Sequence, residues 1–308
     1  MTKAKTSILF TTTLSIIFVF GIASFMSGNN KTNPSQNSSI STPLEKTFDS
    51  VIALSEYFQK TNYLWPINQS TKIPHIQINA VPADLKTAPI QEKKTLFLRL
   101  MIPIILAEKK HLREKRELIE QIFSREEAPI TPESSPWFTS LLKEYRVSLK
   151  LDFEAQKQQL LKKVDELPTS FILAQAAIES GWGTSRFAIE GNSLFGEWTY
   201  GKNKGLVPNE RQEGKSHQVK AFANISESVR SYIRNINRNR AYQELREIRA
   251  QMRQQNKKLD ASKLAEGLIR YSEKGVDYVT TVQKLLNSPE FKLIESLDLQ
   301  PESVASST

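Results

Sequence analysis

The chain has 308 residues, of which 39% are hydrophobic and 24% are charged, a composition typical of a globular protein with one or two domains. It contains no cysteine, which excludes disulfides, thiolate nucleophiles and cysteine-ligated metal sites. Its histidines (His75, His111 and His217) are far apart in sequence, so neither a histidine-based triad nor a zinc site is expected. The net charge of +9 indicates an anionic partner or surface.

The N-terminal segment predicts export. Residues 6–28 carry no charge and follow Lys3 and Lys5, and residues 6–26 have about the length of a membrane-spanning helix. This stretch is longer than the apolar core of most signal peptides, and no clear cleavage site follows it, which favours an uncleaved anchor over a cleaved signal. Because the lysines would stay in the cytoplasm, the rest of the chain is expected outside it. Export argues against a nucleic-acid partner.

Residues 29–46 are polar and predict a flexible linker after the anchor or signal at residues 1–28. A helix is expected near residues 47–58, followed by proline-broken extended pieces. A long helix, or a kinked pair of helices, should then cover residues 96–122, with a bend at Pro103. Its second half carries opposite charges four residues apart, which is typical of a solvated face.

Prolines within residues 126–136 indicate a boundary, after which residues 137–163 are expected to be helical. Another helix should open at Pro168. Residues 195–200 and 217–222 flank a stretch rich in glycine and lysine, and they predict the two arms of a small β-hairpin. Four further apolar helix faces follow. The predicted fold class is therefore mainly α with a small β-hairpin.

One of these helices ends in a carboxylate. Residues 171–178 are apolar apart from Gln175, so this helix should lie in the core, yet Glu179 follows directly. Gln175 and Glu179 are four residues apart and share one helix face. Gly181 then suits a left-handed turn that would end the helix.

Two effects are expected to raise the pKa of Glu179: apolar surroundings that include Trp182, and the negative end of the helix dipole. A carboxyl group that stays protonated near neutral pH can protonate a departing sugar oxygen, as glycosidases require. The alternative for Glu179 is a structural role, as a helix cap or as a partner of Arg186.

The chain resembles the bacterial peptidoglycan β-N-acetylglucosaminidases, glycoside hydrolase family seventy-three, in two blocks: AQAAIESGWG at residues 174–183 and GNSLFG at residues 191–196. Within this family it is most similar to the Bax-type members, as judged by GLVP at residues 205–208 and YSEKG at residues 271–275. The resemblance covers residues 135–292 strongly and the preceding basic region more loosely.

This resemblance implies a lysozyme-like (α+β) catalytic domain over residues 131–292. Residues 47–130 would then be an N-terminal helical extension of unknown role, and residues 293–308 a C-terminal tail. The resemblance also implies that Glu179 is the general acid and that neither a metal nor an organic cofactor is needed.

The family places a second acidic group on the hairpin, and Glu210 is nearest to that position. Glu213 and Glu197 are alternatives, because the chain lacks the Thr-Thr-Glu-Tyr run of the flagellar-type members. A solvated loop glutamate remains the structural interpretation of each. The acetamide oxygen of an N-acetyl sugar can also serve as the nucleophile, which would make a second carboxylate unnecessary.

Several other side chains are expected to contact the sugar or to shape its site. They are Gln175, Trp182, Asn192, Phe195, Trp198, Tyr242 and Tyr278. Tyr242 matches a family tyrosine that lines the cleft, and the other aromatic rings are candidates for stacking on sugars. Core packing is the competing role, and the stronger one for Trp182 and Phe195. Asn192 is expected to hold the turn after the catalytic helix.

Arg230, Arg234 and Arg238 are spaced four residues apart and form a basic stripe. This stripe could bind the carboxylates of peptide stems or anionic wall polymers, or it could only keep the outer face soluble. The sequence as a whole predicts a monomeric, periplasmic endo-β-N-acetylglucosaminidase, tethered to the inner membrane, that cleaves peptidoglycan glycan strands. The alternatives are a lytic transglycosylase and an inactive wall-binding protein of the same fold.

Overall fold

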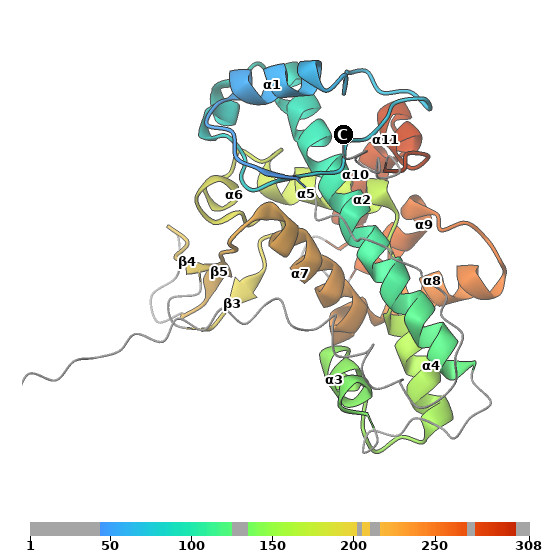
Figure 1. Ribbon diagram of the computed structural model, residues 1–308. Coiled ribbons are helices and arrows are strands. Elements are labelled where there is room, and N and C mark those ends of the chain that lie inside the picture. The colour runs from blue at the N-terminus through green and yellow to red at the C-terminus, as the bar shows by residue number, and fades with distance from the viewer. Residues whose placement is uncertain (1–43, 125–134, 202–204, 210–215, 270–274, 300–308) are drawn as a thin grey trace, which may run out of the picture. The chain divides into compact units, whose positions relative to one another are not determined.

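The computed structural model describes residues 44–124, 135–201, 205–209, 216–269 and 275–299, which all belong to one compact unit. Helices dominate this unit, and two small sheets accompany them (Figure 1). The prediction of a mainly helical fold with a small hairpin is therefore confirmed. The predicted anchor within residues 1–28 lies outside the described residues, as do Glu210 and Glu213.

The helices up to the hairpin are α1 (Val51–Lys60), α2 (Ile90–Phe123), α3 (Pro136–Glu144), α4 (Phe153–Lys163), α5 (Thr169–Ser180) and α6 (Arg186–Gly191), with the 3-10 helix η1 (Ala83–Thr87) before α2. Those after it are α7 (Ile225–Arg238), α8 (Gln243–Gln254), α9 (Ala261–Ala265), α10 (Val276–Leu286) and α11 (Pro289–Ile294), with the 3-10 helices η2 (Arg240–Tyr242) and η3 (Glu266–Leu268). The predicted helix over residues 137–163 is thus two helices, α3 and α4.

The predicted hairpin is part of a three-stranded antiparallel sheet. Its arms are β3 (Trp198–Thr199) and β5 (Gln218–Lys220), and β4 (Gly205–Leu206) pairs with the other side of β5. A second sheet is formed by the parallel pair β1 (Leu44–Lys46) and β2 (Ile76–Ile78). The end of the predicted linker is therefore a strand rather than a flexible segment.

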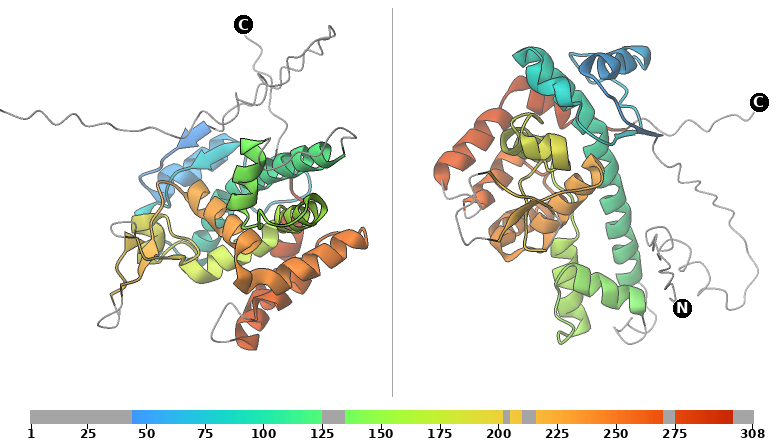
Figure 2. Two further views of the ribbon diagram at one scale, coloured as in Figure 1. Left: turned by 90° about the horizontal axis from the view of Figure 1, so that it is seen from below. Right: turned by 90° about the vertical axis from the view of Figure 1, so that its left-hand side faces the viewer.

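Helix α2 is the longest helix among the described residues and packs against both α5 and α7 (Figure 1, Figure 2). It continues through Pro103, where a bend was predicted. Residues 96–106 are buried, and this apolar packing offsets the backbone hydrogen bond that a proline inside a helix removes. One hydrophobic cluster joins residues from α1 to α11. The predicted boundary at residue 131 therefore does not separate two cores.

The second half of α2 was predicted to be a solvated face, but several of its charged side chains contact other parts of the core. The Arg116–Glu120 pair expected on it is present, with 2.8 Å between Nε and Oε1. However, Lys109 is buried and its Nζ donates to Thr169 Oγ1 at 3.0 Å, and Arg113 pairs with Glu166 at 3.0 Å. These contacts hold α2 against the start of α5.

A buried ion cluster centred on Asp165 fixes the segment that enters α5. Arg253 donates to both carboxylate oxygens of Asp165 at 2.9 and 3.1 Å, and Arg249 Nε lies 3.6 Å from Oδ2. Burial alone would raise the pKa of Asp165, but Arg249, Arg253 and Arg116 together lower it. The cluster connects α5 to α8 and α2.

None of the helices in the described part of the chain combines the length and the apolar character that crossing a membrane requires. The predicted C-terminal tail, residues 293–308, begins inside α11.

Candidate active site

Helix α5 carries Glu179 into the site from the middle of the core. Every residue from Thr169 to Ala177 is buried, as expected for a helix that is apolar on all faces. The helix begins at Thr169, directly after Pro168, as predicted. Glu295 accepts hydrogen bonds from the backbone N–H and the hydroxyl of Ser170 at 3.0 and 2.8 Å. This carboxylate satisfies a free donor at the positive end of the helix.

A tight loop ends α5 immediately after Glu179. Gly181 has φ 58° and ψ 47°, the left-handed conformation predicted for it. Ser180 is buried, and its hydroxyl donates to Ala176 O at 2.5 Å while accepting from Gly183 N–H at 2.8 Å. The hydroxyl of Ser180 thus holds the loop against the helix, which explains the serine next to Glu179.

The same loop is seated on α2. Trp182 has a positive φ of 61°, which is costly for a bulky residue. Its half-buried ring lies 6.1 Å from the ring of Phe97, edge to face, and 5.1 Å from Lys94 Nζ. A Cβ on Gly183 would lie only 2.8 Å from Phe97 Cδ2, so only glycine fits there. Trp182 therefore packs on α2, the competing role considered for it.

A chain of hydrogen bonds leads from the core to Glu179. Tyr232 donates its hydroxyl proton to Gln175 Oε1, Gln175 Nε2 donates to Tyr278 Oη at 2.8 Å, and Tyr278 donates to Glu179 Oε1 at 2.7 Å. Gln175 is fully buried, and Tyr278 is 8% exposed. Gln175 and Tyr278 thus orient Glu179, and the burial of Tyr278 does not support the sugar-stacking role predicted for it.

The environment of Glu179 favours its protonated form. Burial raises the pKa of Glu179, and the hydrogen bond from Tyr278 lowers it by a smaller amount. The structural alternative, a pair with Arg186, is not formed. Arg186 instead contacts Glu190 at 3.2 Å and donates to Val207 O at 2.6 Å.

Glu197, directly before β3, is a second carboxyl group in an unusual environment. Burial raises its pKa against the opposing effects of Lys220, Ser231 and nearby arginines. Ser231 donates to Glu197 Oε2 at 3.1 Å, and Lys220 Nζ donates to Ser231 Oγ at 2.9 Å. The other oxygen, Oε1, is buried and has no hydrogen-bond partner among the described residues. Ser231 and Tyr232 are consecutive residues of α7. Ser231 donates directly to Glu197, and Tyr232 is linked to Glu179 through the hydrogen bonds of Gln175 and Tyr278.

The remaining predicted residues take different positions. Trp198 is 63% exposed and stacks on His217 with 4.5 Å between ring centroids, so one ring face is open to a ligand. Asn192 adopts φ 51° and donates to Phe222 O and Ala223 O at 3.2 and 3.3 Å, which holds the turn as predicted. Tyr242 is buried in η2.

Phe195 does not support the predicted contact with sugar. It is 3% exposed and its ring stacks on that of Tyr232 at 3.9 Å. Phe195 therefore has a packing role beside the hydrogen bonds that run from Tyr232 through Gln175.

Sequence reasoning missed Tyr232, Ser231 and Ser180. Tyr232 lies on one of the apolar helix faces expected after the hairpin, and a buried tyrosine hydroxyl usually finds a polar partner. Its partner is 57 residues away in sequence, and no local pattern identifies it. Within the described residues, no group of three or more His, Cys, Asp or Glu side chains is placed to hold a metal ion.

Comparison with known proteins gives a family match that includes α5 and the hairpin. Residues 155–290 match the Glucosaminidase family, described as mannosyl-glycoprotein endo-beta-N-acetylglucosaminidase. The chain is similar to Protein bax of Escherichia coli (strain K12), with 32% identity over 189 residues. The aligned part is 60% of this chain and 66% of that protein, just under two thirds of its length. No solved structure matches the chain significantly.

Proposed function

We propose that the chain is a peptidoglycan hydrolase, an endo-β-N-acetylglucosaminidase with Glu179 as general acid, because residues 155–290 match the Glucosaminidase family. The observation that carries this proposal is the environment of Glu179. Burial raises its pKa, and Tyr278 holds one of its oxygens at 2.7 Å. A carboxyl group with a raised pKa stays protonated to a higher pH than an ordinary glutamate, and the hydrogen bond holds it in a fixed position.

In the proposed reaction, Glu179 donates its proton to the glycosidic oxygen as the bond to N-acetylglucosamine breaks. Positive charge then develops on the sugar ring and must be neutralised. Either a second carboxylate activates water for attack on the sugar, or the acetamide oxygen of the substrate attacks the sugar carbon at the broken bond. In the second case, water then hydrolyses the cyclic intermediate that forms. The proton lost from the water returns Glu179 to its starting state.

Glu197 is the second carboxyl group that the described residues support best. Among their carboxyl groups, only Glu179 and Glu197 have raised pKa values. Pairs of perturbed carboxyl groups are typical of glycosidase sites. Glu197 directly precedes the exposed ring of Trp198, which we propose as a sugar-binding surface. Glu210 and Glu213 are the competing residues.

The proposed substrate is the glycan strand of peptidoglycan. We further propose that the protein acts in the periplasm, held at the inner membrane by its N-terminal segment. The sequence of residues 1–28 supports this location, because an uncharged stretch follows two lysines.

Mass analysis of purified peptidoglycan digested by the full chain tests the proposed function. New reducing N-acetylglucosamine ends are the expected result. Ends of the 1,6-anhydromuramyl type would instead identify a lytic transglycosylase. Binding to the polymer without any new ends would identify a wall-binding protein that has the fold but not the activity.

A further inference from the structure

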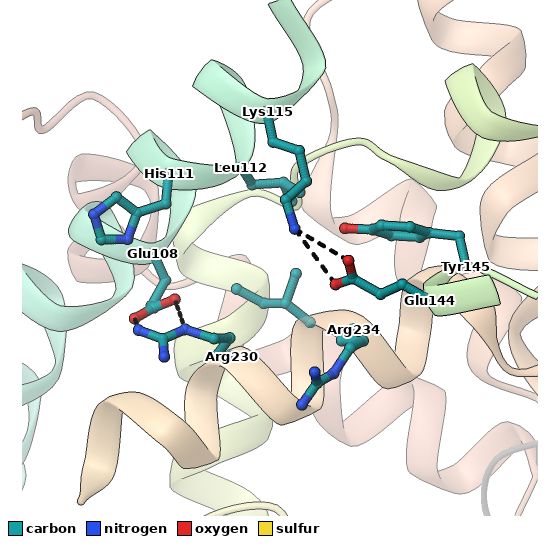
Figure 3. A pocket seen from close by; sticks show the side chains of 9 residues that line it. Glu108, His111, Leu112, Lys115, Glu144, Tyr145, Arg230 and Arg234 are labelled. Carbon is teal, nitrogen blue, oxygen red and sulfur yellow. Dashed lines mark hydrogen bonds and ion pairs between the residues drawn. The ribbon is translucent and has the colours of Figure 1, made fainter. Parts of the chain in front are cut away.

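A small cavity of about 110 Å³ lies between α2, the end of α3 and α7 (Figure 3). The charged side chains that line it include Glu108 and Lys115 from α2, Glu144 from α3, and Arg230 and Arg234 from α7. Since a water molecule occupies roughly 30 Å³ in the liquid, the cavity has room for a carboxylate group and one or two waters.

Each of the two carboxylates that line this cavity already has a cationic partner. Glu108 is 6% exposed and accepts two hydrogen bonds from Arg230, at 2.9 and 2.7 Å. Glu144 lies 3.4 Å from Lys115 Nζ. The guanidinium group of Arg234 has no hydrogen bond or ion pair within the part of the chain that the structure describes. It points away from the pair of Lys115 and Glu144 (Figure 3).

Arg234 belongs to a cluster of three cations, the arginine cluster, with Arg238 and Arg146. Arg238 follows one turn later on α7, and among the described residues its side chain makes a single long hydrogen bond, 3.5 Å, to Glu144 O. Arg146 is exposed, and the described residues offer its side chain no ion pair. The pKa of Arg238 is lowered by burial and then by Arg234 and Arg146, while Glu144 and Glu197 raise it by smaller amounts, so the repulsion from the two arginines exceeds that attraction.

The arginine cluster also extends toward the proposed site. Arg234 and Arg238 both act electrostatically on Glu197, the candidate second carboxyl group. An anionic ligand bound by these arginines would therefore lie beside the glycan that Glu197 and Trp198 contact. Guanidinium groups bind carboxylates through paired hydrogen bonds, and an anion would relieve the repulsion among them.

We propose that the arginine cluster binds the carboxylates of the peptide stems that peptidoglycan strands carry. This inference rests on the proposed function and adds a specificity to it. The protein should prefer strands with stems to strands from which the stems have been removed.

Binding measurements in the Glu179→Gln background test this inference, because no strand is cut and hydrolysis does not enter the result. The probes are soluble, uncross-linked glycan strands with their stems, and the same strands after treatment with an amidase. The double variant Arg234→Gln/Arg238→Gln should bind stem-bearing strands about tenfold more weakly, the loss expected for charged hydrogen bonds. Its affinity for stem-free strands should not change.

The control Lys257→Gln/Lys258→Gln removes the same charge from exposed positions and should leave both affinities within about twofold, as exposed charges contribute little. Arg146→Gln, at an exposed position, repeats the test if the double variant folds poorly.

Equal affinity of the parent for both strands would overturn the inference, as would equal losses in the test and control variants. Tighter binding to phosphatidylglycerol vesicles, lost in the double variant, would show that the cluster binds a lipid surface instead. A failure of the proposed function would appear separately, as an absence of new reducing ends.

Discussion

Glu179 and Glu197 lie in environments that favour the protonated form of a carboxyl group. Each is also oriented by a hydroxyl group, from Tyr278 for Glu179 and from Ser231 for Glu197. As the general acid, Glu179 can donate a proton only until the pH exceeds its pKa, whereas Glu197 can activate water only in its ionised form, above its own pKa. The pH dependence of activity is therefore the direct readout of these environments.

Tyr278→Phe is expected to shift the pH profile of kcat/KM. The hydroxyl of Tyr278 stabilises the ionised form of Glu179, so its removal should raise the pKa of Glu179 further. Because the general acid works when protonated, the limb of the profile that falls at high pH should move to higher pH. Tyr57→Phe, which changes a tyrosine packed against Phe48, is the matched control. An unchanged or downward-shifted limb would contradict the role given to Tyr278.

Glu197→Gln should reduce kcat on purified peptidoglycan by about 100-fold or more, the usual contribution of a general acid or base. The same substitution at Glu210 and at Glu213 provides the comparison. If Glu197 is the second group, only its variant loses activity to this extent. A large loss in Glu210→Gln with little change in Glu197→Gln would move the role to the hairpin residue that the family resemblance favoured.

At the scale of elements, the segment before α5 depends on buried charge as well as on apolar packing. Asp165 is 3% exposed and Arg249 is fully buried, so each needs the other to remain charged in the core. These contacts join segments that are 84 to 88 residues apart in sequence.

Asp165→Asn should lower the free energy of unfolding by about 3–5 kcal/mol, because it leaves Arg249 as an uncompensated buried charge. Urea unfolding measures the change, and Asp298→Asn, at a side chain that is 80% exposed, should have little effect.

The pKa of Asp165 is lowered in the folded state. Its contribution is therefore complete above the unfolded pKa of about 3.9 and is lost as the pH falls through the folded pKa. The stability of the Asn variant should depend less on pH in that acid range, and an equal dependence would contradict this account.

Local signals explain which elements could be predicted. The left-handed Gly181, the hairpin arms and most of the amphipathic helices follow from residue type and spacing, and the structure confirms them. The contact of Tyr278 with Glu179 spans 99 residues, and no periodicity encodes it. The charges of α2 look solvated in sequence because their partners, such as Glu166, come from a distant segment.

For the whole molecule, the residues before the family match belong to the same core as the site. Helix α2 packs against α5 and α7, and its Phe97 seats the loop that follows Glu179. The resemblance alone suggested a separate extension, because the family blocks begin after it in sequence.

A chain that begins at residue 131 should therefore fail to fold. Residues 96–106 of α2 are buried, and each large apolar side chain contributes about 1.5–3 kcal/mol on burial. Their sum exceeds the net stability of about 5–15 kcal/mol that is typical of a protein. Thermal unfolding followed by circular dichroism should show no cooperative transition, whereas a chain that begins at Thr42 should retain it. A cooperative transition in the shorter chain would establish an independent catalytic domain.

The most direct test of the account compares the rates at which the unaltered protein and Glu179→Gln release reducing ends from purified peptidoglycan. Glutamine keeps the shape of the side chain and can still accept the hydrogen bond of Tyr278, but it has no proton to donate. The account predicts a loss of at least about 100-fold, with wild-type activity in Glu190→Gln, which changes an exposed glutamate on α6. Release of reducing ends by Glu179→Gln at the wild-type rate would contradict it.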